Sequence, residues 1–147
     1  FMPVVVHAME EDKYDAWLLA KKAEIEQAKQ EAAASLTASL SQEELMTIGE
    51  KVYVDRCAVC HQVSGAGIPG AFPAITGSKI ATGDVDTHID VVVNGRAGTA
   101  MQAFANQLSD KEIAAVVTYQ RNGLGNSTGD VVQASDVNAF KASKEGQ

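Results

Sequence analysis

The residues best suited to chemistry in this chain are two cysteines and a histidine that stand within five positions. Cys57 and Cys60 are the only cysteines of the sequence, and His61 follows directly, in the segment RCAVCHQ. Three kinds of site use cysteines at this spacing: a redox-active dithiol, a zinc site, and a haem held through two thioether bonds. The segments that surround the motif discriminate among these chemistries.

The residues around the motif favour covalent haem c. A thioredoxin-like dithiol follows a strand of a parallel sheet, but SQEELMTIGEKVYVDRC has helical spacing and alternating strands are missing. A closed zinc site usually adds a second pair of ligands, whereas only His7 and His88 remain in the sequence. We therefore expect one haem, bound by thioethers to Cys57 and Cys60, with His61 as the proximal ligand of its iron.

Met101 is the best candidate for the second axial ligand. It is the only methionine after the motif, in NGRAGTAMQAFANQLSDKE, a loop-like stretch between two helical patterns. A loop can bring a ligand to the iron without competing with the hydrogen bonds of a helix. An isolated methionine more often fills a gap in a core, but the haem motif reverses that preference. The rival ligand is His88, which stands beside acidic residues, and we expect it to be a solvated surface side chain.

Two helix starts flank the proposed haem site. Ser41 with Glu44, and Ser109 with Glu112, each form a capping-box pattern. We therefore expect helices to begin near residues 42 and 110, and the second to stop at Asn122-Gly123.

A glycine in the first of these helices indicates a close contact. Gly49 costs up to about 1 kcal/mol relative to alanine in a helix interior. Such a cost predicts that another backbone approaches closely at this position, and the helix around Tyr119 is the expected neighbour.

These residues together resemble the class I cytochromes c, over roughly residues 42 to 125. The resemblance implies an all-α fold in which the first and last helices cross at Gly49, Tyr53 and Tyr119. In the family, a proline carbonyl of the loop here written FPAITG accepts a hydrogen bond from the proximal histidine ring, which identifies Pro73.

The resemblance also supplies the apolar contacts of the haem. It implies that Ile75 packs on the haem face and that Phe104 lies beside Met101. One residue departs from the family pattern, because Met101 is followed by Gln102 where the family usually has proline. The loop is therefore expected to be less constrained.

The segment before residue 41 needs a separate interpretation. FMPVVVHAMEEDKYDAWL starts with an apolar run typical of a strand, which is followed by an acidic helix start. We predict a lone strand, then a helix over residues 10 to 35, then a linker.

The start of the chain resembles the end of the copper-binding cupredoxin domain of cytochrome c oxidase subunit II. The resemblance covers about residues 1 to 25 and maps the last ligand of the binuclear copper centre onto Met2. The family's other copper ligands precede that methionine, so no copper is expected in this piece. We thus assign residues 1–40 to the last strand, helix and linker of a cupredoxin domain, and 41–147 to a cytochrome c domain with a C-terminal tail.

The two resemblances imply a function as part of cytochrome c oxidase subunit II in an oxidase with a fused cytochrome c. The haem domain would relay single electrons to the copper centre, with no catalysis by this piece alone. Its implied partners are oxidase subunit I, the rest of subunit II, and a donor that is a cytochrome or a quinol-oxidising complex. Its implied location is the periplasmic side of the bacterial inner membrane, anchored there in the full-length protein. The alternative is a free periplasmic class I cytochrome c.

Composition limits the other possibilities. A chain of 147 residues with 46% hydrophobic residues can bury one core, and the longest apolar run is too short to cross a bilayer. The formal charge of −7 and the lack of a Lys or Arg cluster argue against nucleic acid and anionic membrane surfaces as partners. A strand over residues 2–7 would leave backbone groups unpaired, so we expect copies to associate through it.

Overall fold

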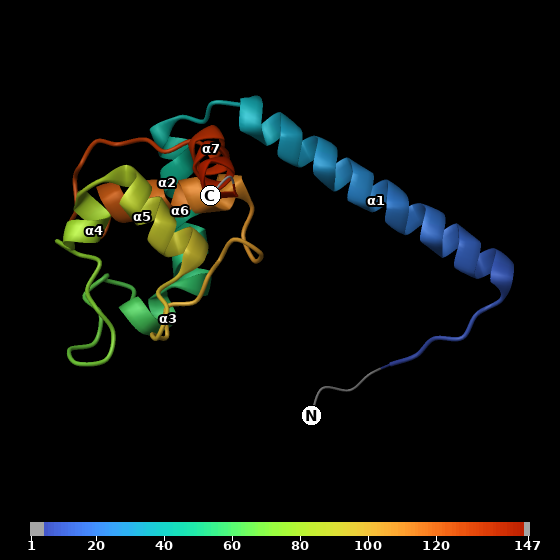
Figure 1. Ribbon diagram of the computed structural model, residues 1–147, viewed down its shortest axis with the longest axis horizontal. Coiled ribbons are helices and arrows are strands. Elements are labelled where there is room, and N and C mark those ends of the chain that lie inside the picture. Colours follow the sequence, from blue (N-terminus) through green and yellow to red (C-terminus); the bar gives the residue numbers. More distant parts are fainter. Residues whose placement is uncertain (1–4, 146–147) are drawn as a thin grey trace. The chain divides into compact units, whose positions relative to one another are not determined.

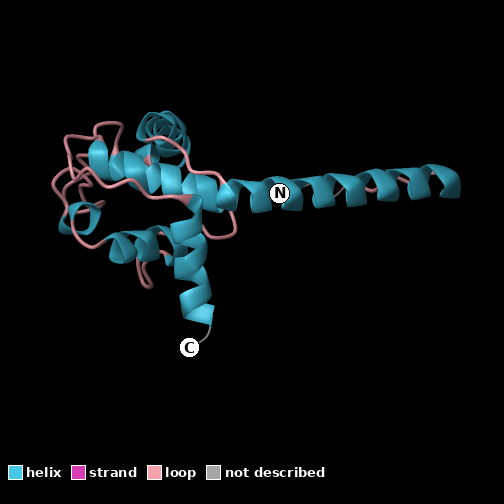
Figure 2. Cartoon of the chain, turned by 90° about the horizontal axis from the view of Figure 1, so that it is seen from above, coloured by secondary structure: helices cyan, strands magenta, loops and turns pink. Residues whose placement is uncertain are grey.

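The computed structural model describes residues 5–145, and in this range the chain is helical (Figure 1). The helices are α1 (Glu11–Thr37), α2 (Gln42–Arg56), α3 (Ala58–His61), α4 (Lys79–Thr82), α5 (Val85–Asn94), α6 (Asp110–Asn122) and α7 (Ala134–Glu145). Figure 2 shows helices and loops throughout, and the described residues contain one isolated antiparallel bridge, between Ile68 and Phe72, but no strand. The predicted all-α fold is confirmed.

The chain divides into two compact units, Phe1–Ala34 and Ser35–Gln147. Most of the first unit is α1, which confirms the long helix predicted before residue 41. Large apolar side chains of α1 are exposed, and the rings of Tyr14 and Trp17 pack on each other with centroids 5.9 Å apart. None of the helices described in residues 5–145 is long and apolar enough to cross a membrane.

The predicted N-terminal strand is corrected where the structure describes it. Residues 5–10 form neither helix nor strand, and the earlier part of the predicted strand lies outside the described residues. A strand needs a partner for its backbone hydrogen bonds, and no strand within residues 5–145 offers one.

The second unit is built around the crossing of α2 and α6. A Cβ atom on Gly49 would lie 2.1 Å from the carbonyl oxygen of Ala115 and 2.7 Å from Cβ of Tyr119, distances that no side chain can occupy. The rings of Tyr53 and Tyr119 also meet here, with centroids 5.6 Å apart. The predicted close approach at Gly49, with the helix around Tyr119 as the neighbour, is confirmed.

Both predicted helix starts are confirmed by their caps. Ser41 and Ser109 each accept a hydrogen bond from the backbone of the glutamate three residues later, whose carboxylate accepts one in return. The second helix, α6, ends where predicted, because the N–H of Gly123 donates to the carbonyl of Tyr119 at 2.7 Å. Side chains from Ile113 to Val117 are fully buried, so α6 supplies the centre of the core.

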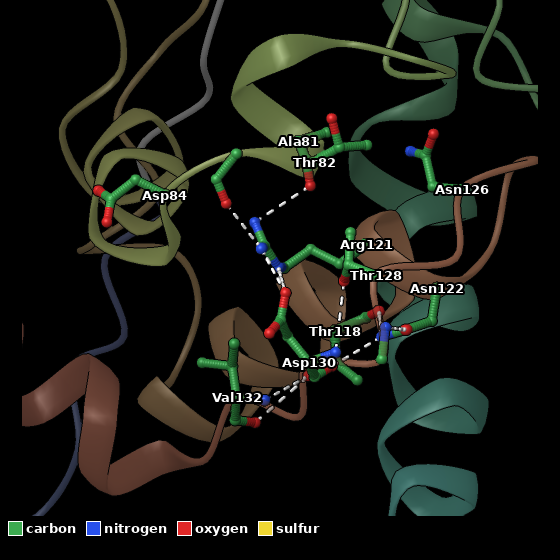
Figure 3. A network of polar contacts seen from close by, with 12 residues as sticks. Ala81, Thr82, Asp84, Thr118, Arg121, Asn122, Asn126, Thr128, Asp130 and Val132 are labelled. Carbon is green, nitrogen blue, oxygen red and sulfur yellow. Dashed lines mark hydrogen bonds and ion pairs between the residues drawn. The ribbon is translucent and has the colours of Figure 1, made fainter.

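A buried arginine connects α6 to the segments around it (Figure 3). The guanidinium of Arg121, whose residue is 2% exposed, donates to the carbonyls of Ala81 at 3.1 Å and Gly83 at 2.8 Å. It also forms an ion pair with Asp130. The arginine thereby joins the end of α4 to the chain that leads into α7.

The last helix, α7, was not predicted from the sequence. It packs against α6 and buries Val137 and Phe140 in the common core. Its amino group at Lys141 contacts the carboxylate of Asp110 at 2.5 Å, which fastens the helix to the start of α6.

Candidate haem site

One cavity of about 370 Å³ collects the residues for which the sequence predicts chemistry. Its walls come from the end of α2, from α3, α4, α5 and α6, and from the two loops 71–75 and 96–104. All seven predicted site residues line it: Cys57, Cys60, His61, Pro73, Ile75, Met101 and Phe104.

The two cysteines face the cavity because the chain makes one further helical turn after α2. Cys57 separates α2 from α3, and its carbonyl accepts hydrogen bonds from the N–H groups of Cys60 at 3.2 Å and His61 at 3.0 Å. Gln62 then leaves the helix with a φ of 63°, in the left-handed region. This turn places both thiols and the imidazole within five residues on one wall of the cavity.

The state of the cysteines argues against a redox dithiol. Both thiols are free and partly buried. Burial, and to a smaller extent the neighbouring Cys60, raises the pKa of the Cys57 thiol to about 11. A catalytic dithiol needs a lowered pKa to supply a thiolate, so this environment suits thiols that serve as attachment points.

The orientation of His61 is fixed by the loop that the sequence analysis singled out. Its ring Nδ1 lies 2.8 Å from the carbonyl oxygen of Pro73. A carbonyl oxygen only accepts, so Nδ1 carries the proton and Nε2 keeps its lone pair, which is the form that binds a metal. Gly67 allows the close approach, since a Cβ there would lie 2.6 Å from the Pro73 carbonyl oxygen.

The loop that carries Met101 is held by hydrogen bonds of its own. The carbonyl of Met101 accepts from the N–H of Arg96 at 2.9 Å, and its N–H donates to the hydroxyl of Thr99 at 3.1 Å. The N–H of Phe104 donates to the carbonyl of Val92 at 3.1 Å, which ties the loop to α5. These contacts restrain the backbone at Met101 although proline is absent from the next position.

The two apolar site residues form buried walls. Ile75 is 9% exposed and Phe104 is 5% exposed. Ile75 is positioned by Asn126, a residue that the sequence analysis missed: its amide nitrogen donates to the carbonyls of Ile75 at 3.1 Å and Gln120 at 2.7 Å. Its amide oxygen accepts from the N–H of Gly77 at 2.8 Å.

The expectation that His88 is a solvated surface residue is wrong. His88 is 3% exposed, lines the cavity, and places Nε2 2.7 Å from the amide oxygen of Gln120. The pKa of His88 is lowered to about 4, mainly by burial and in part by the charge of Arg121, against the opposing effect of the hydrogen bond to Gln120. The sequence held a signal, because His88 lies four residues before the buried Val92, on the same face of α5.

The donor groups of the cavity fit a haem c. Two free thiols can form thioethers, and an imidazole and a thioether are an axial ligand pair of cytochrome haem. The remaining wall is mainly apolar by area, and its polar residues are Arg56, Ser78, His88, Arg96, Thr99, Gln102 and Gln120. Within residues 5–145, the ring nitrogen Nδ1 of His88 is buried and has no hydrogen-bond partner, so one polar atom of a side chain that lines the cavity lacks a polar contact.

Comparison with known proteins identifies the family. The sequence model of the family described as cytochrome c oxidase, cbb3-type, subunit III matches residues 44–119. The chain belongs to this cytochrome c family. It is therefore a cytochrome c domain, and such domains bind haem c.

Individual relatives of this cytochrome c domain have varied contexts. Cytochrome c-552 of Thermus thermophilus is 36% identical over 108 residues, which are 64% of this chain and 78% of that protein. The cytochrome c subunit of alcohol dehydrogenase (quinone) of Gluconobacter oxydans is 34% identical over 103 residues, or 63% of this chain and 22% of that subunit. The cbb3-type cytochrome c oxidase subunit CcoP of Azospirillum brasilense is 35% identical over 80 residues, or 50% of this chain and 27% of that subunit.

The chain thus spans about a fifth of the length of the alcohol dehydrogenase subunits that it matches. The predicted resemblance to cytochromes c is confirmed, and several relatives are subunits of larger redox proteins. None of the relatives named here is an oxidase subunit II, so that assignment and the cupredoxin origin of residues 1–40 stay predictions.

Proposed function

We propose that residues 41–147 relay single electrons from a respiratory donor to the binuclear copper centre of a cytochrome c oxidase, as the haem c domain of its subunit II. The observation that carries the electron-transfer function is the convergence of two free thiols, an oriented imidazole and a thioether on one cavity. A relative that is an oxidase subunit supports the respiratory setting. The pattern of residues 1 to 25 supports subunit II.

In this proposal each site residue has a separate task. The sulfur atoms of Cys57 and Cys60 would hold the haem covalently, and Nε2 of His61 and the thioether of Met101 would bind its iron. The bound haem supplies a one-electron couple at its iron. Ile75 and Phe104 would exclude water from the haem, and the Pro73 carbonyl keeps the His61 ring in the orientation that leaves Nε2 free to bind the iron.

Attachment to the oxidase would replace a diffusional encounter by an intramolecular one. A short flexible link gives an effective concentration on the order of millimolar. A tethered donor does not need a basic rim to find its acceptor, which is compatible with the net charge of −7. Electron delivery to copper should therefore depend only weakly on salt, and a dependence as steep as that of a freely diffusing pair would contradict tethering.

The ligands are tested by spectroscopy of the matured protein. The oxidised protein should show a sulfur-to-iron charge-transfer band, which Met101→Leu should abolish and Met46→Leu, a change in α2 away from the cavity, should leave in place. Cys57→Ser should leave the haem attached through one bond only, which mass spectrometry of proteolytic peptides detects. A charge-transfer band that survives in Met101→Leu would exclude this residue as a ligand.

A second function is favoured by one comparison. The similarity to cytochrome c-552 covers 78% of that protein, so a free periplasmic electron carrier fits the same domain. The gene decides between the two functions. Codons for two cysteines and two histidines in a copper-ligand pattern before residue 1 support subunit II, and their absence supports the free carrier.

A further inference from the structure

The strongest unexplained feature of the described residues is a nitrogen atom of His88. Its Nδ1 is the buried side-chain nitrogen or oxygen atom that has no hydrogen-bond partner within residues 5–145. The residue is 3% exposed, so bulk water does not reach the ring. The same side chain lines the candidate haem cavity.

Leaving such an atom without a partner is unfavourable. A polar group taken out of water without a compensating hydrogen bond destabilises the folded state, and buried polar groups in proteins are nearly always paired. The ring cannot turn away cheaply, because Nε2 already forms a 2.7 Å hydrogen bond with Gln120 of α6. The occupant of the cavity is therefore the natural source of the missing partner.

The chemistry of a haem c leaves few groups that could be this partner. Its vinyl groups are consumed by the thioether bonds, and its methyl groups are apolar. The two propionate carboxylates are the polar groups of its rim. We propose that His88, oriented by Gln120, donates a hydrogen bond from Nδ1 to a propionate of the haem and so acts as a positioning residue.

This inference rests on the proposed haem binding and adds a residue that neither the iron nor the thioethers require. The ring has two forms that can donate from Nδ1. In one, the side-chain amide of Gln120 is turned over from its orientation in the structure, where its oxygen lies 2.7 Å from Nε2, so that its NH₂ group donates to Nε2 and the neutral ring carries its proton on Nδ1. In the other, the amide keeps its orientation and the ring is protonated, so that both nitrogens donate; the negative charge of the propionate then offsets the effect of burial, which lowers the pKa of His88. A carboxylate accepts from either form.

The hydrogen bond should affect the reduction potential. A propionate bears a negative charge close to the iron and favours the oxidised state, which has one more positive charge. A donor at the carboxylate withdraws part of that negative charge and raises the potential. Removing the donor should lower the potential.

Two variants separate the two ring nitrogens of His88. The amide of His88→Gln lies where Nε2 was, so it keeps the contact with Gln120 and loses the group at Nδ1. The amide of His88→Asn lies where Nδ1 was and retains a donor there. We expect His88→Gln to lower the ratio of reduced to oxidised haem at a fixed ambient potential about threefold, or ~28 mV for one electron. His88→Asn should restore most of this loss in the same spectroelectrochemical titration.

A vibrational measurement tests the contact without any substitution. The resonance Raman band of propionate bending should shift when the wild-type protein is moved from H₂O to D₂O, because the proposed hydrogen bond exchanges its proton. The shift should be smaller in His88→Gln than in the wild type, where Arg56 and Arg96 are the remaining donors of the cavity wall, and it should persist in full in His88→Asn. An equal potential in wild type and His88→Gln, or a wild-type band that does not respond to D₂O, would overturn the proposal.

A different set of results is expected if the assignment of the haem ligands is itself wrong. A wild-type protein that matures without covalent haem, or without the sulfur-to-iron charge-transfer band, contradicts the ligand assignment before any variant is made. A wild type with both properties and no effect at His88 contradicts the propionate contact alone. If neither variant matures, the isotope shift in the wild-type protein still decides.

Discussion

At the residue scale, buried polar side chains connect segments that are far apart in the sequence. Asn126 spans 51 positions to reach Ile75, and His88 spans 32 to reach Gln120. Each forms hydrogen bonds with other protein groups in place of water, within a core that is mostly apolar. These few side chains position the walls of the cavity, because a hydrogen bond fixes both distance and direction.

Asn126→Leu should destabilise the domain strongly. Leucine has a similar volume but leaves the carbonyls of Ile75 and Gln120 and the N–H of Gly77 without their side-chain partner. We expect a loss of roughly 2–4 kcal/mol in the free energy of unfolding, measured by urea titration of the haem protein.

Asn138→Ala is the matched control. This asparagine lies on the exposed side of α7, and its contact with Asp110 is long, at 3.4 Å. The change should alter stability by less than about 0.5 kcal/mol. An equal effect of the two substitutions would show that the hydrogen bonds of Asn126 do not stabilise the fold.

Asp130 gives the domain an acid-sensitive contact. A hydrogen bond from Arg121, and to a smaller extent one from Thr128, holds the pKa of its carboxyl below the ordinary value. The unfolded chain therefore binds more protons in acid, and stability falls as the pH drops through about 4 and below. The side chain is 41% exposed, so the contribution lost is modest, about 0.5–1 kcal/mol.

Comparison of wild type with Asp130→Asn isolates this contribution. Urea unfolding at pH 7 should show the wild type as the more stable protein, and the difference should shrink in acid as the carboxylate of the wild type is protonated. A difference that stays constant from pH 7 to pH 3 would mean that the charge of Asp130 does not contribute.

At the element scale, the contact of α2 with α6 positions the haem motif at the wall of the cavity. Gly49 lets the two backbones meet, and Tyr53 continues the contact toward the haem motif. The hydroxyl of Tyr53 donates to the carbonyl of Gln62 at 2.7 Å, so the same helix also fixes the end of α3. Packing between two helices therefore sets the position of the cysteines and of His61.

Gly49→Ala should destabilise the protein although alanine is the better helix former. Helix propensity would favour the variant by up to about 1 kcal/mol. The added Cβ would lie 2.1 Å from the Ala115 carbonyl oxygen, which forces the helices apart and exposes core surface. We expect a net loss of roughly 2–4 kcal/mol, measured by urea unfolding.

Thr47→Ala tests the same helix at an exposed position. It raises helix propensity without a new contact, so the free energy of unfolding should change by less than about 0.5 kcal/mol. A Gly49→Ala protein as stable as Thr47→Ala would contradict the close approach of the two helices.

At the scale of the whole molecule, the chain consists of two units, and the buried core of the described residues lies in the second of them. The unit from Ser35 to Gln147 contains the buried core and the cavity. In the unit from Phe1 to Ala34, the helix α1 keeps large apolar side chains such as Leu19 and Ile25 exposed, at 68% and 56%. The haem domain should therefore fold without the first unit.

Deletion of residues 1–34 tests this independence. Because the core lies within residues 35–147, the midpoint of thermal unfolding, followed by haem absorbance, should change by less than about 2 °C. A large fall in the midpoint would show that the first unit stabilises the haem domain. The deletion also removes residues 2–7, so concentration-dependent association of the full chain should disappear with it.

The sequence by itself determined the features that contiguous residues encode. The motif Cys57-Cys60-His61 specifies its chemistry within five positions, and the capping boxes at Ser41 and Ser109 mark two helix starts. Gly49 indicated a close helix contact because its cost needs a compensating gain. Each of these signals acts over one or two helical turns, so no knowledge of the fold was required.

Only the tertiary structure decided which polar residues are buried and what they contact. His88 stands among acids in the sequence, yet the packing of α5 on α6 turns it inward to Gln120. In the middle of helix α7, Val137 and Phe140 are the buried apolar residues. Two such residues make a weak sequence pattern, and the helix is stabilised by its packing on the core. The physical reason is common to both: burial depends on partners from distant segments, and the local sequence does not specify where those segments lie.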